Sequence, residues 1–191
     1  IRTHSSEWVG WKKETKILDS NGNPLLMYNR SHTDFENFEL EKRNLPNKSG
    51  SNKFGFFFSD RKDDMEHYGP FIKSRYLNIK NPLDIRDLGN RTKYKNFRAK
   101  LSELGISDKD LAGFDLAFQD LHLARNEKLG SSSSSQGMND TRMATFNFFD
   151  AGNGSYLRKL LLNKGFDGVI FEDEYEGALT AIAFNPEQIV D

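Results

Sequence analysis

The sequence contains no cysteine, and its histidines are few. Without cysteine the protein can form neither disulfide bonds nor thiolate metal sites. The four histidines are too scattered along the chain to predict a zinc cluster. We therefore expect a function that needs no metal. The absence of cysteine fits a reducing cytosol, and it equally fits a protein that is exported unfolded and refolds elsewhere.

Excess charge of one sign and long apolar runs are also missing. The 27 basic and 28 acidic residues give a formal net charge of −1. Such a balance provides no overall attraction to nucleic acid, so we expect no nucleic-acid partner. No apolar run approaches the roughly 20 residues that span a bilayer, and the first residues lack the apolar centre of a signal peptide. We therefore expect no membrane span.

Aromatic residues, by contrast, are abundant. The chain has 16 phenylalanines, several of them clustered at positions 54–58 and 146–149. Most of these side chains are expected in the core. With 191 residues and 36% hydrophobic content the chain can bury one sizeable core. We expect residues 1–191 to form a single domain.

The first half of the chain predicts mainly strands joined by turns. A short helix is expected near Trp8 and Trp11, and Asn21-Gly22 predicts a hairpin turn. Later in this half, a polar loop precedes a buried strand, which is followed by a helix capped by Ser59 or Asp60. The ranges of the expected elements are a hairpin at 15–29, a loop at 31–53, strands at 54–60 and 71–80, and a helix at 61–68.

The second half predicts helices followed by two strands. Residues 92–125 have helical spacing in two pieces, with Ser107 as the N-cap of the second, and form a helical insert. Five consecutive serines predict a Ser-rich loop over 126–142. A helix capped by Ser155 and ended by Gly165 leads into two strands, "GVIF" and "LTAIAF". This order predicts an α+β fold with a mainly antiparallel sheet.

A group of carboxylates separates the last two predicted strands. Its members are Glu172, Asp173, Glu174 and Glu176. Acidic residues between strands often form only a solvated turn. The alternative is a functional site that uses the negative charge. Two flanking strands would give such a loop the rigid support that a site requires.

Four strings, taken in their order along the chain, resemble an ADP-ribosyltransferase of the type found in phage polyvalent proteins and secreted bacterial effectors. The strings are "PLLMYNRSHTDFENF", "FGFFFSDRKDDMEHYG", "YLNIKNPLDI", and "GFDGVIFEDEYEG" with "IAFNPEQI". The resemblance implies a split antiparallel β-sheet core with flanking helices, and it leaves the helical insert and the serine tract unmatched. It also implies NAD as co-substrate.

The implied activity is NAD-dependent mono-ADP-ribosylation of a host protein side chain. A narrower similarity is to bacterial effectors that modify a threonine of host ubiquitin, which would make the chain a secreted effector acting in the host cytosol. A bacterial or phage-encoded cytoplasmic protein is the alternative location. Two other functions stay open: an NAD glycohydrolase that uses the same site, and a lapsed transferase fold that acts as a binding module.

The resemblance assigns the catalytic role to the acidic loop. Glu174 and Glu176 form a Glu-Tyr-Glu unit similar to the ExE element of toxin-type transferases. It implies Glu176 as the catalytic carboxylate and Glu174 as its helper or as the group that positions the acceptor. A different alignment, "TAIAF" against the Glu-Tyr-Ile-Val strand of the polymerase branch, puts Thr180 in the catalytic position instead.

The cofactor-binding residues are implied in the same way. Asn29, Arg30 and Ser31 occupy the positions of His, Gly and Ser in the family's Tyr-His-Gly-Ser motif. Phe57 stands where the polymerase branch has a tyrosine, and Tyr68 where the family has its stacking tyrosine. Ser59 lies where toxin-type relatives use a serine, although a role as a helix cap is an equally good interpretation.

Overall fold

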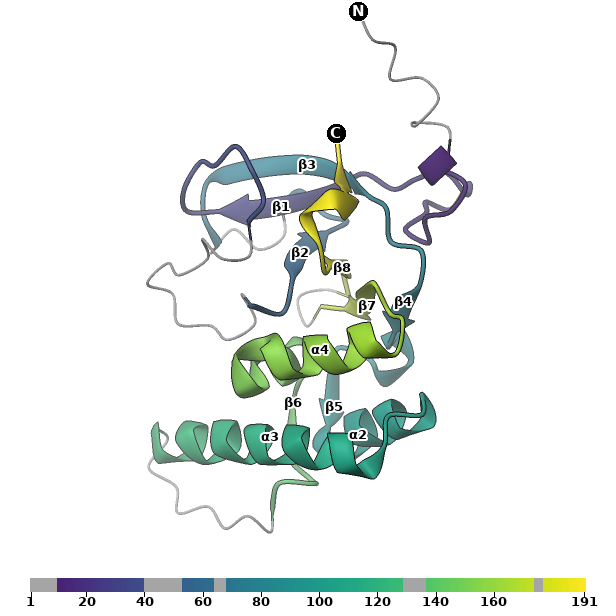
Figure 1. Cartoon of the computed structure of the whole chain (residues 1–191). Coiled ribbons are helices and arrows are strands. Elements are labelled where there is room, and N and C mark those ends of the chain that lie inside the picture. The colour runs from purple at the N-terminus through teal and green to yellow at the C-terminus, as the bar shows by residue number, and fades with distance from the viewer. Residues whose placement is uncertain (1–9, 40–52, 64–67, 129–136, 174–176) are drawn as a thin grey trace, which may run out of the picture.

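The computed structural model describes residues 10–39, 53–63, 68–128, 137–173 and 177–191. Its centre is a curled sheet of seven strands in the order β4-β7-β8-β2-β1-β3-β9 (Figure 1). The strands are β1 (Met27–Ser31), β2 (Phe56–Ser59), β3 (Phe71–Leu77), β4 (Pro82–Asp84), β7 (Gly168–Glu172), β8 (Leu179–Ala183) and β9 (Ile189–Val190). All neighbours are antiparallel except β4 and β7. The predicted α+β class is confirmed.

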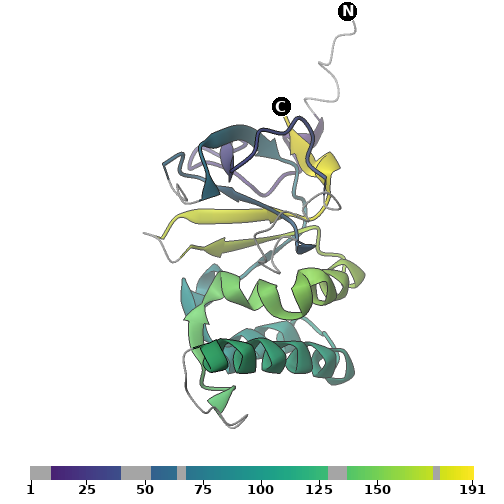
Figure 2. The same cartoon turned by 90° about the vertical axis from the view of Figure 1, so that its left-hand side faces the viewer.

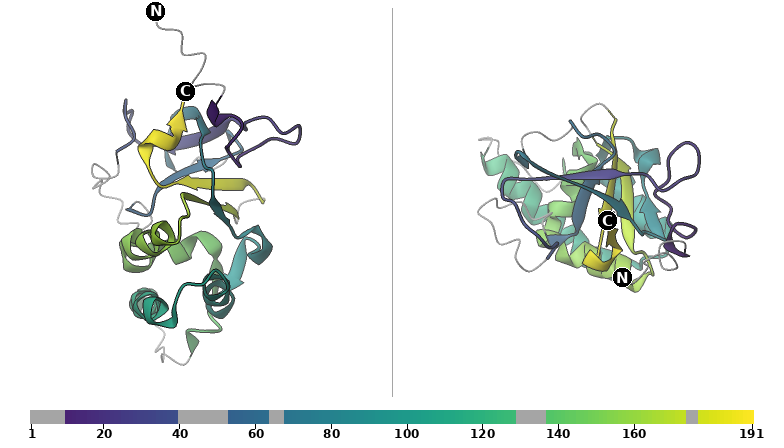
Figure 3. Two further views of the ribbon diagram at one scale, coloured as in Figure 1. Left: turned by 45° about the vertical axis from the view of Figure 1, so that its right-hand side comes forward. Right: turned by 90° about the horizontal axis from the view of Figure 1, so that it is seen from above.

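The seven-stranded sheet is split between β1 and β2. These strands pair only at Tyr28 and Ser59, whereas β1 and β3 pair over the whole of β1. Beyond that pair, the Asn29 side-chain amide donates a hydrogen bond to the carbonyl oxygen of Phe57 at 2.7 Å. Seen from above, β1 and β3 run across the direction of β2 and β8 (Figure 3). The predicted split sheet is confirmed.

Side chains on β2 alternate between two apolar layers, as a strand buried on both faces requires. Phe56 and Phe58 are fully buried in one layer together with Met27 and Ile170. Phe57 points to the opposite layer and is only partly buried. The sequence predicted core packing for the two phenylalanines of one parity, and this is confirmed.

Three α-helices lie on one side of the sheet: α2 (Tyr94–Glu103), α3 (Asp108–Lys128) and α4 (Ser155–Asn163). Helix α4 lies between the sheet and the pair α2 and α3 (Figures 1 and 2). Helix α3 begins as predicted, because the Ser107 hydroxyl accepts a hydrogen bond from the Asp110 amide at 3.2 Å. None of these three helices is long and apolar enough to cross a membrane, and the other described segments contain none that is.

The predicted start of α4 is wrong by one residue. Ser155 is the first helical residue rather than the cap, and its hydroxyl donates to the Gly152 carbonyl oxygen at 3.3 Å. The N-cap is Gly154, whose φ of 74° lies in the left-handed region that glycine adopts without a steric penalty. The predicted end of the helix at Gly165 agrees with its φ of 85°.

A second, two-stranded sheet was not predicted. It pairs β5 (Arg91–Lys93) with β6 (Arg142–Ala144) and brackets the helical insert. The predicted Ser-rich loop overlaps the end of α3 and the first residue of β6, and residues 129–136 lie outside the described residues. The 3₁₀ segment η5 (Thr145–Gly154) then leads into α4, and shorter 3₁₀ turns are η3 (Arg86–Leu88) and η6 (Pro186–Gln188).

Other predicted elements of the first half are partly described. The hairpin at 15–29 is present as a turn, in which the Asp19 carboxylate accepts hydrogen bonds from the amides of Asn21 and Asn23, and as an isolated antiparallel bridge between Leu18 and Pro24. The predicted helix at 61–68 is described only at its ends, where residues 62–63 form a turn. Trp8 lies outside the described residues.

Candidate functional site

The β7–β8 hairpin presents the acidic loop. The last strand pair is Glu172 with Leu179, and beyond it the Asp173 amide donates to the Ala178 carbonyl oxygen at 2.9 Å. Gly177 has a φ of 67°, a left-handed conformation that lets the chain turn back into β8. The predicted catalytic residues Glu174 and Glu176 lie outside the described residues. The described chain on both sides of them is held in place.

A further residue, Asp60, fixes the same hairpin. Its carboxylate accepts a hydrogen bond from the Leu179 amide at 3.0 Å, and its own amide donates to the Leu179 carbonyl oxygen at 3.0 Å. The end of β2 is thereby joined to the start of β8, next to the acidic loop. Sequence reasoning treated Asp60 only as a helix cap. The register of β2 against β8 was needed to find its position.

Arg30 is held by backbone carbonyl groups. Its guanidinium donates to the Lys62 carbonyl oxygen at 2.9 and 3.2 Å and to the Gly69 carbonyl oxygen at 3.2 Å. Within the described ranges no carboxylate forms an ion pair with it. The positive charge of Arg30 therefore has no neutralising partner in the described part of the protein.

Gly69 brings Tyr68 next to the end of β1. A side chain at position 69 would have its Cβ 2.3 Å from the Ser31 carbonyl oxygen, so only glycine permits this approach. Tyr68 itself is 43% exposed. Ser31 accepts a hydrogen bond from the Thr33 amide at 3.0 Å through its hydroxyl, which in turn donates to the Thr33 carbonyl oxygen. Ser31 thus shapes the turn that follows β1.

The sheet consists of two half-sheets, β4-β7-β8-β2 and β1-β3-β9, which meet at a junction between β2 and β1. Asn29 and Ser59 both lie at this junction, on opposite faces of the sheet. Asn29 is buried and uses its amide to join the halves. Ser59 is fully buried, and its hydroxyl accepts a hydrogen bond from the Arg61 amide at 3.1 Å. Of the six predicted cofactor-binding residues, Asn29, Phe57 and Ser59 lie at the junction, with Phe57 and Ser59 on the same face of β2 by alternation. The other three, Arg30, Ser31 and Tyr68, lie toward the end of β1.

Thr180 lies directly opposite Ser59 in the β2–β8 register. It is 1% exposed, and its hydroxyl has no hydrogen-bond partner among the residues that the structure describes. A buried hydroxyl without a partner is unfavourable by about 1–3 kcal/mol. The alternative alignment singled out this position, and the structure places it on the face of the sheet that Phe57 also occupies.

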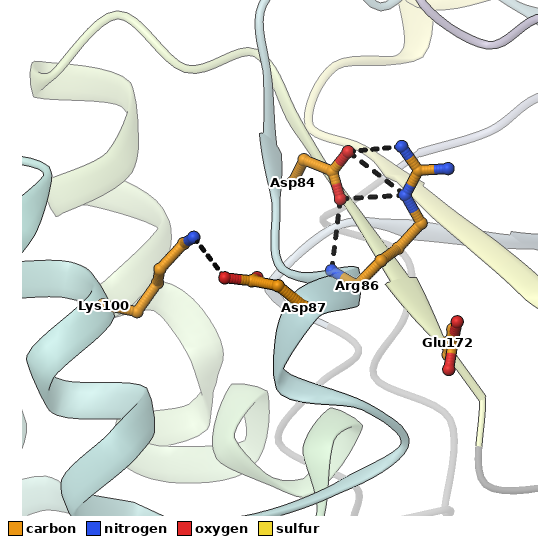
Figure 4. Close-up of a pocket in the computed structure, with 5 residues that line it drawn as sticks. All are labelled: Asp84, Arg86, Asp87, Lys100 and Glu172. Atoms are coloured by element: carbon orange, nitrogen blue, oxygen red, sulfur yellow. Dashed lines mark hydrogen bonds and ion pairs between the residues drawn. The ribbon is translucent and has the colours of Figure 1, made fainter.

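A pocket opens at the edge of the sheet, where the parallel strands β4 and β7 end (Figure 4). Its cavity of about 590 Å³ is lined by Asp84, Arg86, Asp87, Lys100 and Glu172. Arg86 binds the Asp84 carboxylate through two nitrogens at 2.5 to 3.1 Å. Lys100 binds Asp87 at 2.7 Å. No motif predicted this pocket, because its charges come from three separate segments of the chain.

The paired charges of this pocket stabilise one another. The hydrogen bond from Arg86 lowers the pKa of Asp84. The pKa of Arg86 is raised, first by its hydrogen bond to Asp84 and more weakly by the charge of Glu172. The hydrogen bond to Asp87 likewise raises the pKa of Lys100. Asp84, Arg86 and Lys100 are therefore each held in their charged form.

Metal chemistry was not expected from the sequence. Across the described ranges no group of three or more His, Cys, Asp or Glu side chains is arranged to hold a metal ion. The groups that the junction and the hairpin present are carboxylates, a guanidinium and aromatic rings.

Comparison with known proteins gives one strong match. A family model described as "ADP-Ribosyltransferase in polyvalent proteins" matches residues 19–190. A search of curated proteins gave no match. Among solved structures, one described as "Crystal structure of an anti-CRISPR protein" has 13% sequence identity and a TM-score of 0.38, with 84% of this chain and 90% of that chain covered. That structural similarity is too weak to support an argument.

Proposed function

Because this chain belongs to the ADP-ribosyltransferases of polyvalent proteins, we propose that it is an NAD-dependent mono-ADP-ribosyltransferase which modifies a protein side chain. The observation that carries this proposal is the family match over residues 19–190. The family uses NAD as co-substrate, so the reaction joins ADP-ribose to the acceptor and releases nicotinamide.

The reaction requires negative charge beside a sugar. The bond between nicotinamide and the ribose carbon breaks, nicotinamide leaves with the bonding electrons, and the ribose becomes positively charged, as a sugar does in glycoside hydrolysis. An acceptor oxygen then bonds to that carbon, and its proton passes to a carboxylate. A carboxylate stabilises the charged sugar more than the ground state. We assign this role to Glu176, with Glu174 as its helper.

The frame around the acidic loop supports this assignment. The strands β7 and β8 pair up to Glu172 and Leu179, and Asp60 fixes the start of β8 through two hydrogen bonds. A catalytic group needs such support, because small displacements from the reactive geometry lower the rate strongly.

The junction of the half-sheets and the end of β1 offer groups that fit NAD. The rings of Phe57 and Tyr68 suit the positively charged nicotinamide ring, which aromatic faces attract. The guanidinium of Arg30, which no described carboxylate neutralises, suits the pyrophosphate. Asn29 fits less well than the sequence suggested, because its amide already donates to Phe57. Its carbonyl oxygen is the part that would contact a ribose hydroxyl.

The identity of the acceptor is a finer proposal. The resemblance to effectors that modify a threonine of ubiquitin supports a host protein as acceptor, ubiquitin as its narrowest form, and a secreted bacterial effector as the setting. A threonine hydroxyl is a weak nucleophile at neutral pH and needs a base nearby. Two glutamates on one loop, Glu174 and Glu176, can divide this work between them.

Labelled NAD tests the proposed function. The protein is incubated with ³²P-labelled NAD and either ubiquitin or a host-cell lysate, and the products are separated. We expect a labelled protein band, and mass spectrometry should show that the acceptor gains one ADP-ribosyl group. Free ADP-ribose without any labelled protein would instead indicate a glycohydrolase. If calorimetry detects no NAD binding at all, the result favours a lapsed transferase fold that acts as a binding module.

Substitution of the loop glutamate tests the mechanism. We expect Glu176→Gln to lower the rate of transfer by about 100-fold or more, because it removes charge in the transition state, while the NAD dissociation constant stays within a few-fold. The measurement is initial-rate transfer together with calorimetry. Glu187→Gln, an exposed substitution in η6, is the matched control and should keep full activity. An active Glu176→Gln variant removes this residue from the mechanism.

A further inference from the structure

The pocket at the ends of β4 and β7 contains one charge that its other residues do not neutralise. Arg86 is bound to Asp84, and Lys100 is bound to Asp87. Glu172 is the fifth lining residue, and its carboxylate forms no hydrogen bond or ion pair within the described part of the chain. Figure 4 shows its carboxylate apart from both ion pairs. The pocket therefore carries one uncompensated negative charge.

This charge distribution selects the chemistry of an occupant. An anion would compete with Asp84 and Asp87 for their cations, and it would meet Glu172 as a like charge. A metal ion would need several carboxylates, and here two of the three are already bound to basic side chains. A single cationic side chain fits best, because it pairs with Glu172 without breaking either existing ion pair.

The position of the pocket points to a protein as the source of that cation. Glu172 is the last residue of β7, and Glu174 follows two residues later in the sequence. Two residues of extended chain span at most about 7 Å. Any protein whose acceptor group reaches the acidic loop must therefore place part of its surface close to this pocket.

We propose that the pocket formed by Asp84, Arg86, Asp87, Lys100 and Glu172 is a docking site for an arginine or lysine side chain of the acceptor protein, with Glu172 as its counter-ion. This inference rests on the proposed function for the identity of the partner as an acceptor. The binding of a cation to the pocket does not depend on catalysis and can be measured separately.

A small probe tests the pocket directly. Acetyl-arginine amide is titrated into the ¹⁵N-labelled protein, and acetyl-citrulline amide, which has nearly the same shape without the charge, is the matched ligand. We expect the arginine probe to shift the backbone amide signals around Glu172, Asp87 and Lys100 at millimolar concentration, and the citrulline probe to leave them in place. Glu172→Gln should weaken arginine binding by about three- to fivefold, as for a solvent-accessible ion pair.

The same titration can also contradict the inference that the pocket binds a cation. The inference is wrong if the arginine probe shifts the signals near the exposed Glu187 as strongly as those of the pocket, or if Glu172→Gln leaves its affinity unchanged. Because the Glu172 side chain makes no hydrogen bond within the described ranges, the variant should fold normally, and thermal unfolding checks this.

Kinetics then connect the pocket to the acceptor. With ubiquitin as acceptor, Glu172→Gln should raise the KM for ubiquitin by about three- to fivefold and keep kcat, because it removes an interaction made equally in the ground and transition states. The Glu187→Gln control should change neither. A fall in kcat with unchanged KM contradicts docking. If the wild type transfers ADP-ribose neither to ubiquitin nor to any protein of the host-cell lysate while the arginine probe binds, the proposed function fails and the cation site stands.

Discussion

Thr180 places a polar hydroxyl group in a buried part of the sheet. Its hydroxyl, which has no hydrogen-bond partner in the described part of the chain, is enclosed between β2 and β7, where an apolar side chain of the same shape would fill the space equally well. The cost of such a group is its desolvation, because water bonds it in the unfolded chain but not in the core.

We therefore expect Thr180→Val to raise the free energy of unfolding by about 1 kcal/mol, measured by urea denaturation. Thr180→Ala, which also removes the buried methyl group, should lower it relative to Thr180→Val by about 1 kcal/mol. Transfer activity separates the two alignments of the last strand. Activity retained in Thr180→Val agrees with Glu176 as the catalytic group, whereas its loss in a stable variant would place Thr180 in the site.

Sequence reasoning succeeded for single residues where the determinant is local. The burial of Phe56 and Phe58 follows from strand alternation, and the cap at Ser107 follows from a serine preceding a helical pattern. It failed where the determinant is a partner far away in the sequence. Asp60 acts on Leu179, and no pattern near Asp60 reveals this.

At the scale of elements, the hairpin of β7 and β8 depends on the end of β2. Asp60 binds both the amide and the carbonyl group of Leu179, so it fixes the residue at which the acidic loop returns to the sheet. At the base of the loop, the Asp173 amide donates a hydrogen bond to the Ala178 carbonyl oxygen at 2.9 Å.

Removal of the Asp60 carboxylate should loosen this hairpin without unfolding the protein. We expect Asp60→Ala to increase the hydrogen-exchange rate of the Leu179 amide by about tenfold, since one hydrogen bond of about 1.4 kcal/mol is lost, and to lower transfer activity in parallel. Asp60→Asn keeps a carbonyl oxygen that can accept the same bond, so it is the matched control. An unchanged exchange rate of the Leu179 amide in Asp60→Ala would show that the β7–β8 hairpin does not depend on the Asp60 carboxylate.

Elements were predictable when their pattern was long. The strands β2, β3, β7 and β8 and the helices α2, α3 and α4 all appear where apolar spacing and turn residues predicted them. The strands β5 and β6 have only three residues each, too few to show alternation, and they form by pairing across the helical insert. The parallel pairing of β4 with β7 is likewise a property of the tertiary fold.

At the scale of the whole molecule, aromatic stacking connects the sheet to the helices. Phe149, in η5, stacks on Phe54 with ring centroids 4.5 Å apart and also contacts Phe171 of β7 and Phe97 of α2. All four side chains are buried, with at most 1% exposed. One ring therefore touches segments from both the core sheet and the insert.

We expect Phe149→Ala to lower the free energy of unfolding by about 3–5 kcal/mol, because it leaves a cavity between these layers. If residues 1–191 form one domain, far-UV circular dichroism, which follows the helices, and tryptophan fluorescence, which follows the sheet side near Trp11 and Tyr76, should report the same urea midpoint. Leu116→Ala, at a position of α3 that is 64% exposed, should change stability by less than about 0.5 kcal/mol. Separate midpoints for the two probes would divide the chain into two cooperative units.

The side-chain amide of Asn29 determines what a substitution at position 29 can change. Each half-sheet keeps its own backbone ladder, and the halves meet through one residue pair, the Asn29 side-chain hydrogen bond and the apolar cluster that contains Met27, Phe56 and Phe58. A substitution at that position alters the spacing between the halves and leaves the strand pairing inside each half intact. Mutation of this one polar contact can thus change how the halves meet, while the backbone pairing of each half and the shared apolar cluster are retained.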